Sequence, residues 1–371
     1  MRLHPLSLLL MIPLLSACAS GGQPRFNVPA LPQATSMPPA NPARVIATLP
    51  QRIDSFDVSP DGKLLALATS GGVRLYELPT YQYLRGLNDG ELASAVAWSP
   101  DGRRMAVGSS KDYGKPFFTG GDSSNSWKAH LTVWDASTWK PVFEPAFGDE
   151  MVNEMFRDLA WSPDNRSLAS SLDTGGVQVL DTQTGQTISR QKDFASSVDR
   201  LAWSPDGSRL LATSDMAYTI RRWRLSNGQA VRLFDRRVGN AMDLAWSPDG
   251  KRIASGHVGG GVCFWTALTN RCDGFIQAHR TATFSLAWSP DGSRLATGGG
   301  VIRLWDTATG ELLRSFGEEA DYVYSHMQWL RDGSLVTLQY SPEEPGKTAL
   351  RLWDPSTGSL TAEWRGRRPA E

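Results

Sequence analysis

The sequence predicts an all-β fold, a seven-bladed β-propeller of four-stranded antiparallel blades, from three observations. A Ser-Pro-Asp-Gly turn or a close variant occurs seven times, and five of the six intervals between turns are 40 to 43 residues long. Each unit holds short segments of alternating apolar and polar residues, and no segment with helical apolar spacing stands out. Four short strands in roughly 42 residues are typical of one propeller blade. The turns begin at Ser59, Ser99, Ser162, Ser204, Ser247, Ser289 and Leu330.

The unit around Ser289 shows how each blade is expected to be built. A first strand ends in Ala-Trp, the proline of the turn presets φ, and the glycine tolerates a positive φ. A second strand is expected at 294–297, a third at 301–305 and a fourth at 311–316. Because the turn aspartates recur in every unit, we interpret them as turn-forming residues and not as catalytic acids.

Eleven of the fourteen tryptophans occupy equivalent positions, at the ends of first or third strands. A large ring between neighbouring blades buries much apolar area, and truncating such a ring costs about 3–5 kcal/mol. We therefore expect these side chains to pack the blades together and not to form a platform for a ligand. They are Trp98, Trp134, Trp161, Trp203, Trp223, Trp246, Trp265, Trp288, Trp305, Trp329 and Trp353.

Residues 44–366 resemble the WD-repeat propellers. The namesake dipeptide occurs at Trp134-Asp135, Trp305-Asp306 and Trp353-Asp354. The Gly-His signature of the family is nearly absent. Its Asp-His-Ser/Thr-Trp network is expected only once, in part, from His279, Thr297 and Trp305. The Trp-Ser-Pro-Asp-Gly turn also resembles repeats of the periplasmic Tol-system propeller.

The first seventeen residues are typical of a secretory signal peptide, because Arg2 precedes an apolar run too short to span a bilayer comfortably. The Leu-Ser-Ala-Cys sequence that ends at Cys18 resembles the bacterial lipobox. That resemblance implies cleavage before Cys18 and lipid attachment to its thiol, which anchors the chain stably through two or more acyl chains. An ordinary signal peptide with an incidental cysteine is the alternative.

Ala19 would be the second residue of the mature chain, which by resemblance to Gram-negative sorting favours the periplasmic face of the outer membrane. In a Gram-positive cell the anchor would lie in the plasma membrane. Residues 18–43 then form a tether rich in proline and alanine, and residues 367–371 form a basic C-terminal tail.

Two terminal strands compete for one place in the ring. Residues 44–49 and residues 359–364 both read as a fourth strand for the last blade. We favour the N-terminal strand as the one that closes blade seven, with the C-terminal strand outermost. The reverse arrangement stays open.

The longest insertion, residues 110–129, falls between the second and third strands of blade two. Its candidate residues for partner contact are Tyr113, Phe117, Phe118 and Trp127, among glycine, serine and aspartate. Aromatic residues in a long polar loop are typical of interaction sites. Packing onto their own blade, or disorder, are the alternatives. A smaller loop in blade seven, Gln339 to Lys347, is expected on the same face.

A candidate polar site lies at the mouth of the central channel. Asp158, Arg200, Asp243 and His326 each precede their turn by four residues, on first strands that line the channel. A small polar ligand is one interpretation, and ordinary polar lining is the other. The sequence shows no catalytic motif, no histidine pair with metal-ligand spacing and no sign of a cofactor. Equal numbers of basic and acidic residues, 38 each, argue against nucleic-acid binding.

Cys263 and Cys272 remain once Cys18 is lipidated. We place them on the third and fourth strands of blade five, about one residue from direct opposition. An even pair of cysteines in an exported protein favours a disulfide.

The leading hypothesis is a lipid-anchored scaffold of the cell envelope that is not an enzyme and binds an unidentified protein. A ligand sensor or enzyme that uses the channel mouth is the alternative. An adhesin-like display module on the cell surface is a third possibility.

Overall fold

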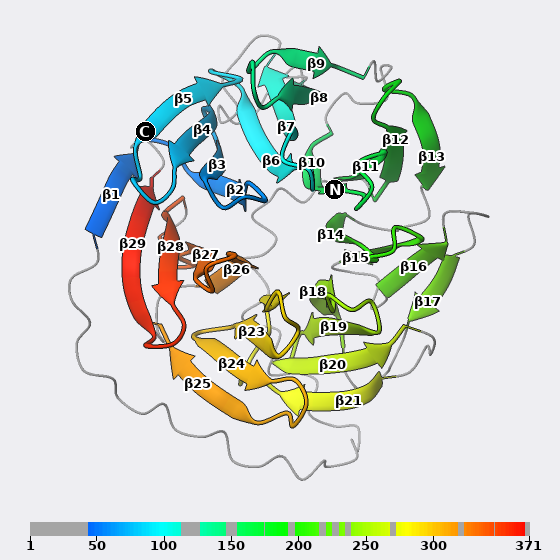
Figure 1. Cartoon of the computed structure of the whole chain (residues 1–371), viewed down its shortest axis with the longest axis vertical. Coiled ribbons are helices and arrows are strands. Elements are labelled where there is room, and N and C mark those ends of the chain that lie inside the picture. The colour runs from blue at the N-terminus through cyan, green and yellow to red at the C-terminus, as the bar shows by residue number, and fades with distance from the viewer. Residues whose placement is uncertain are drawn as a thin grey trace.

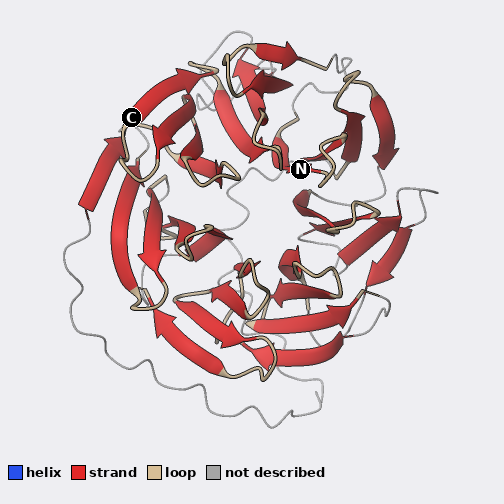
Figure 2. Cartoon of the chain, in the orientation of Figure 1, coloured by secondary structure: helices blue, strands red, loops and turns tan. Residues whose placement is uncertain are grey.

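The computed structural model describes eleven segments of the chain. They are residues 44–112, 127–145, 154–173, 175–191, 197–214, 220–224, 230–233, 239–267, 272–317, 323–344 and 346–367. Within these segments the secondary structure is strand and turn, as Figure 2 shows. The strands form seven sheets arranged in a ring around a central axis (Figure 1), and we call the centre of the ring the channel. The predicted seven-bladed β-propeller is therefore confirmed. In the described segments no helix is long and apolar enough to cross a membrane.

Each blade holds four consecutive antiparallel strands, the first innermost and the fourth on the rim. Blade one comprises β2 (Ile53–Val58), β3 (Leu64–Thr69), β4 (Gly72–Glu77) and β5 (Tyr83–Leu87). Blade two comprises β6 (Leu92–Trp98), β7 (Arg104–Asp112), β8 (Trp127–Asp135) and β9 (Pro141–Phe143). Blade three comprises β10 (Phe156–Trp161), β11 (Ser167–Leu172), β12 (Val177–Asp181) and β13 (Thr187–Gln191). Blade four comprises β14 (Val198–Trp203), β15 (Arg209–Ser214), β16 (Ile220–Arg224) and β17 (Ala230–Leu233).

The remaining blades follow the same plan. Blade five comprises β18 (Ala241–Trp246), β19 (Arg252–His257), β20 (Gly261–Thr266) and β21 (Cys272–Gln277). Blade six comprises β22 (Ser285–Trp288), β23 (Arg294–Gly298), β24 (Ile302–Asp306) and β25 (Leu312–Phe316). Blade seven comprises β26 (Val323–Trp329), β27 (Leu335–Tyr340), β28 (Thr348–Asp354) and β29 (Ser359–Gly366), and β1 (Arg44–Leu49) joins it.

The antiparallel order gives the ring two distinct faces. The Ser-Pro-Asp-Gly turns and the turns between third and fourth strands lie on one face, which we call the turn face. The first strands begin and the second strands end on the opposite face, which we call the loop face.

The favoured assignment of the closing strand is wrong. The C-terminal strand β29 is the fourth strand of blade seven, and β1 pairs in parallel with its outer edge. A four-residue turn links Asp354 to Ser359, so β28 and β29 form a hairpin with little loop-closure entropy to overcome. The N-terminal strand has no such local advantage, and it adds a fifth strand on the rim.

The Ala-Trp dipeptides at the ends of first strands link successive blades. The indole Nε1 of Trp161 donates to the carbonyl oxygen of Ala97 at 3.0 Å, and Trp203 donates to Ala160 at 2.9 Å. Trp288 and Trp329 make the equivalent bonds to the preceding blades, at 3.3 and 3.0 Å. The expected packing role of these tryptophans is confirmed, because the rings on β6, β10, β14, β18 and β22 are buried.

Three third-strand tryptophans, Trp265, Trp305 and Trp353, donate to a hydroxyl group on the neighbouring second strand. Trp305 donates to Thr297 Oγ1 at 3.0 Å, and Nε2 of His279 lies 3.0 Å from the same oxygen, as the sequence predicted. Burial lowers the pKa of His279 to about 3, so its ring is neutral. Blade seven has the shorter pair Trp353 and Thr337, at 2.9 Å.

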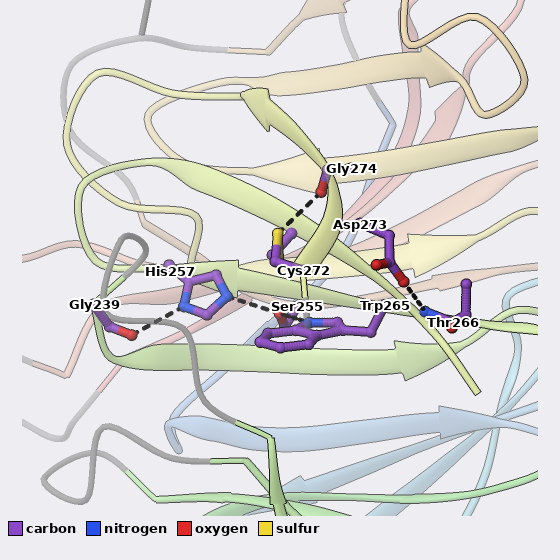
Figure 3. Close-up of a disulfide and its surroundings, with 9 residues drawn as sticks. Gly239, Ser255, His257, Trp265, Thr266, Cys272, Asp273 and Gly274 are labelled. Atoms are coloured by element: carbon purple, nitrogen blue, oxygen red, sulfur yellow. Dashed lines mark hydrogen bonds between the residues drawn. A yellow bond between two sulfur atoms is a disulfide. The ribbon is translucent and has the colours of Figure 1, made fainter. Parts of the chain in front are cut away.

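Blade five carries a second network of this kind, which the sequence analysis missed. Trp265 donates to Ser255 Oγ at 2.8 Å, and Nε2 of His257 lies 2.7 Å from that oxygen (Figure 3). His257 comes from the second strand and not from the preceding loop. A search of the loop that holds the family's Gly-His dipeptide therefore does not find His257.

Blade two lacks the hydroxyl, which leads to a stability prediction. Val107 stands at the equivalent position, and the buried Nε1 of Trp134 has no hydrogen-bond partner among the described residues. We expect Val107→Thr, which is nearly isosteric, to raise the free energy of unfolding by about 0.5–1.5 kcal/mol. Urea denaturation followed by tryptophan fluorescence measures it. Val107→Ala is the control that removes volume without adding an acceptor, and equal destabilisation by both variants would refute the prediction.

The turn aspartates act as expected. In blade one Ser59 Oγ donates to Asp61 Oδ1 at 2.6 Å, and the same oxygen accepts the Lys63 amide at 3.1 Å. These bonds favour the ionised carboxylate, so the pKa of Asp61 is lowered. In the variant turn of blade three, Asn165 takes the place of glycine with a φ of 62°.

Candidate functional site

The four predicted channel residues lie close together, and Arg200 connects them. Its Nη2 donates to the carbonyl oxygen of Ser325 at 2.5 Å, and its Nε lies 3.5 Å from Asp243 Oδ1. Arg200 belongs to β14 of blade four and Ser325 to β26 of blade seven, and these strands face each other across the channel (Figure 1). The arginine side chain therefore crosses the channel and bridges opposite sides of the ring.

The two predicted aspartates hold neighbouring first strands together. Oδ1 of Asp158 accepts the amide of Leu159 at 2.9 Å, and Oδ2 accepts the amide of Leu201 on the next blade at 2.7 Å. Asp243 repeats the pattern with Leu244 and Leu286, both at 2.8 Å. Each carboxylate thus satisfies backbone donors on two blades.

A third aspartate, Asp57, also holds two neighbouring first strands together, and the sequence analysis did not identify it. Oδ1 of Asp57 accepts the amide of Val58 at 2.8 Å, and Oδ2 accepts the amide of Trp98 on blade two at 2.6 Å. Gln328 of blade seven donates to Asp57 Oδ1 at 2.8 Å. Asp57 lies two residues before its turn, so a search at the position four residues before the turn does not find it.

Burial dominates the electrostatics of the cluster. It raises the pKa of Asp57, Asp158 and Asp243 to about 6, although the backbone hydrogen bonds oppose this shift in all three. The guanidinium of Arg200 also lowers the pKa of Asp158 and Asp243. Burial, together with Arg200, lowers the pKa of His326 to about 3. His326 is therefore neutral near pH 7, and its ring packs edge-on against Phe56 at 5.0 Å.

The cluster is built to hold the ring closed. Both oxygens of each aspartate accept hydrogen bonds from backbone amides, and the Arg200 side chain extends across the channel. A polar ligand at this depth would have to displace the arginine. In the described segments, no group of three or more histidine, cysteine, aspartate or glutamate residues is placed to hold a metal ion.

The insertion of blade two is carried by the longest hairpin of the ring. Strands β7 and β8 have nine residues each and remain paired as far as Asp112 and Trp127. The expected loop at 110–129 is therefore partly strand. The hairpin ends on the loop face at Asp112 and Trp127, and residues 113–126 lie outside the described residues. Tyr113, Phe117 and Phe118 lie outside the described residues, and Trp127 is placed as the first residue of β8.

Glu91, just before β6, supports the base of this hairpin. Its Oε2 accepts hydrogen bonds from Ser109 Oγ at 2.7 Å and from Asn88 Nδ2 at 3.0 Å. Its Oε1 lies 3.9 Å from Lys111 Nζ. Blades one and two therefore fix the direction in which the hairpin projects.

Cys263 and Cys272 form a disulfide between β20 and β21 (Figure 3). Their Cα atoms are 5.7 Å apart, within the usual range for such a bond. The expected offset of one residue is wrong. Cys272 pairs with Trp265, two residues after Cys263, because a bulge at Asp273 shifts the register. The two-residue offset puts both side chains on one face of the sheet. Cys18 lies outside the described residues.

Two family profiles match parts of the chain. "WD domain, G-beta repeat" matches residues 232–266 and 270–306, and "Anaphase-promoting complex subunit 4 WD40 domain" matches residues 130–204. These matches fall on blades two to six. WD40 propellers are typically scaffolds for protein–protein interaction and are generally not catalytic.

Several curated proteins are similar over part of their length. Protein transport protein sec13 of Aspergillus fumigatus is 27% identical over 177 residues, which is 44% of this chain and 55% of that protein. Minichromosome loss protein 1 of Schizosaccharomyces pombe is 24% identical over 158 residues, 40% of this chain and 17% of that protein. WD repeat and SOCS box-containing protein 1 of Homo sapiens is 25% identical over 110 residues, 29% of this chain and 26% of that protein. The chain thus spans about half or less of the length of these relatives. It is a seven-bladed β-propeller in which parts of blades two to six match WD40 profiles.

Proposed function

We propose that this protein is an exported, lipid-anchored scaffold of the cell envelope that binds a protein partner at its loop face. The projecting β7–β8 hairpin carries the proposal. It extends the second and third strands of blade two to nine residues, and residues 113–126 connect these two strands in the sequence. Three of the four predicted aromatic contact residues lie in that segment, and the fourth, Trp127, begins β8.

The rival function, a ligand sensor or enzyme at the channel mouth, has less support. The hydrogen bonds of Asp158 and Asp243 go to backbone amides of two blades, and Arg200 bridges the channel. These side chains hold the blades together, so the loop face is the better candidate for binding. WD40 propellers as a class favour a protein as the bound molecule.

Removing the insertion tests the partner site. In one variant Asp112 is joined to Trp127 by an Asn-Gly turn, which suits a two-residue hairpin. In a second, Tyr113, Phe117 and Phe118 are replaced by serine and the length is kept. We expect crosslinking and affinity purification from detergent-solubilised envelopes to recover a stoichiometric partner with the parent protein and with neither variant. A hot-spot residue contributes about 2 kcal/mol or more, so the loss of even one hot spot should weaken the affinity for the partner at least about thirtyfold.

Val142→Ser provides the matched control. Val142 is an exposed apolar residue of the same blade, at 44% exposure, but it lies on the rim strand β9. The control should recover the partner at the parental level. Equal recovery by the parent and both insertion variants would rule out the loop-face site.

The lipid anchor has its own test. Cys18→Ser removes the thiol that would carry the acyl chains, so we expect loss of radiolabelled palmitate and release from the membrane fraction. Cys272→Ser, which keeps Cys18, should retain the label. Labelling of the Cys18→Ser protein would contradict the anchor.

A further inference from the structure

An aromatic and basic cluster marks the rim where blades seven and one meet. The Arg44 guanidinium lies 6.0 Å from the centre of the Tyr81 ring, and Tyr81 packs edge-on against Trp364 at 5.6 Å. Trp364 also contacts Tyr76 at 5.9 Å, and Tyr76 contacts Tyr83 at 5.6 Å. These contacts join the start of β1, the last turn of blade one and the start of β5 into one surface.

The outer side of this cluster is exposed to solvent. Val45 is 44% exposed, Tyr83 54% and Leu84 45%. Arg44 and Arg85 are exposed as well, and Arg85 lies over the Trp139 ring of blade two at 5.6 Å. We call the surface formed by Arg44, Val45, Tyr81, Tyr83, Leu84 and Arg85 the seam corner.

The exposed leucine alone does not distinguish this corner. Leu84 is the bulged residue at the start of a fourth strand, and Ile188 occupies the same position in blade three, at 58% exposure. The flanking residues differ. Leu84 lies between Tyr83 and Arg85, whereas Ile188 lies between threonine and serine. Two aromatic rings and two guanidinium groups therefore distinguish the seam corner from the corresponding position in blade three.

The chain enters the ring at the seam corner. Arg44 begins β1, which runs parallel to β29 and therefore starts at the turn face. Twenty-five residues, 19–43, separate it from Cys18. A proline-rich linker of that length reaches about 80 Å when extended, at about 3.1 Å per residue, and tethering of this kind raises the effective concentration of the corner at the membrane. Even if this corner binds lipid only weakly, the bound state would then be populated.

We propose that the seam corner rests on the surface of the bilayer that holds the lipid anchor, so that the loop face points away from the membrane. Tyrosine side chains and arginine guanidinium groups are the chemistry that suits the headgroup region and anionic lipid. The β7–β8 hairpin of blade two ends at the opposite face, where a protein partner can reach it. This inference rests on the proposed lipid anchor.

Site-specific photocrosslinking tests the orientation. The lipidated full-length protein is reconstituted into phosphatidylethanolamine–phosphatidylglycerol vesicles with p-benzoylphenylalanine at position 84 or, as the matched control, at position 188. We expect lipid adducts at position 84 and few at position 188. Arg44→Gln and Arg85→Gln should each lower the adduct yield about fivefold where docking is weak, since one basic residue near an anionic surface contributes about 1 kcal/mol.

The other outcomes would overturn the proposal. Equal lipid adducts at positions 84 and 188 would show that the propeller tumbles freely on its tether. Adducts with protein at position 84 would show that the corner is a protein interface. Failure of the anchor itself is distinguishable, because an unanchored protein floats free of the vesicles before any crosslinking.

Discussion

Replacing Arg200 with methionine is expected to lower the free energy of unfolding by about 2–4 kcal/mol at pH 7.5. The substitution removes the bond to the Ser325 carbonyl and the cation beside Asp243. It leaves the buried carboxylates of Asp158 and Asp243 without the positive charge that favours their ionised form. Urea denaturation of the two proteins measures the difference.

An arginine on the turn face provides the control. Arg252 also bonds a neighbouring blade, with its Nη1 2.9 Å from the Thr307 carbonyl oxygen, but it is exposed. Arg252→Met should cost less than about 1 kcal/mol. Equal losses from Arg200→Met and Arg252→Met would contradict the special role of the channel bridge.

The difference in the free energy of unfolding between the parent and Arg200→Met should shrink as the pH falls from 7.5 to 5. Burial raises the pKa of Asp158 and Asp243 to about 6, above their ordinary value of 3.8. The stability linked to such groups is fully present below pH 3.8 and is lost as the pH rises through about 6. Removing the guanidinium raises both pKa values further, so the variant loses more than the parent near pH 7. A deficit that grows on acidification would contradict this linkage.

Reduction of the Cys263–Cys272 disulfide should lower the free energy of unfolding by about 2–3 kcal/mol, the contribution expected from closing a loop of about ten residues. The disulfide joins β20 and β21 beside Trp265, which is 1% exposed. Its reduction should therefore destabilise the core of blade five. Thermal melts with and without dithiothreitol measure the effect.

Cys272→Ser gives the matched control for the disulfide. Its melting temperature should match that of the reduced parent and should not respond to dithiothreitol. Mass spectrometry of the mature protein with two free thiols at Cys263 and Cys272 would refute the bond.

The number of blades could be predicted because the fold repeats. One turn and two tryptophan positions recur at about 42 residues, so each unit supports the interpretation of the others. The order of the strands at the ring closure could not be predicted the same way. Residues 44–49 and 359–364 have the same strand pattern, and only the short turn before Ser359 decides between them.

The channel cluster was predicted as a set of positions but not as a set of bonds. The spacing before the turns selected Asp158, Arg200 and Asp243, and Arg200 lies beside both aspartates in the structure. The spacing could not show that each carboxylate accepts hydrogen bonds from backbone amides of two strands. Those bonds depend on how adjacent blades are offset. Asp57 makes the same bonds from a position two residues further along. Equivalent chemistry thus occurs at two positions along the first strand.

Affinity purification from envelopes with the insertion variant and the Arg200→Met variant side by side tests the central claim, that the loop face binds a partner while the channel holds the ring. The variant that lacks residues 113–126 should lose the partner and keep the parental free energy of unfolding. The Arg200→Met variant should have a lower free energy of unfolding than the parent. At a temperature where this variant is folded, it should still recover the partner. Loss of the partner from Arg200→Met, with full recovery by the insertion variant, would contradict the account and place the binding site in the channel.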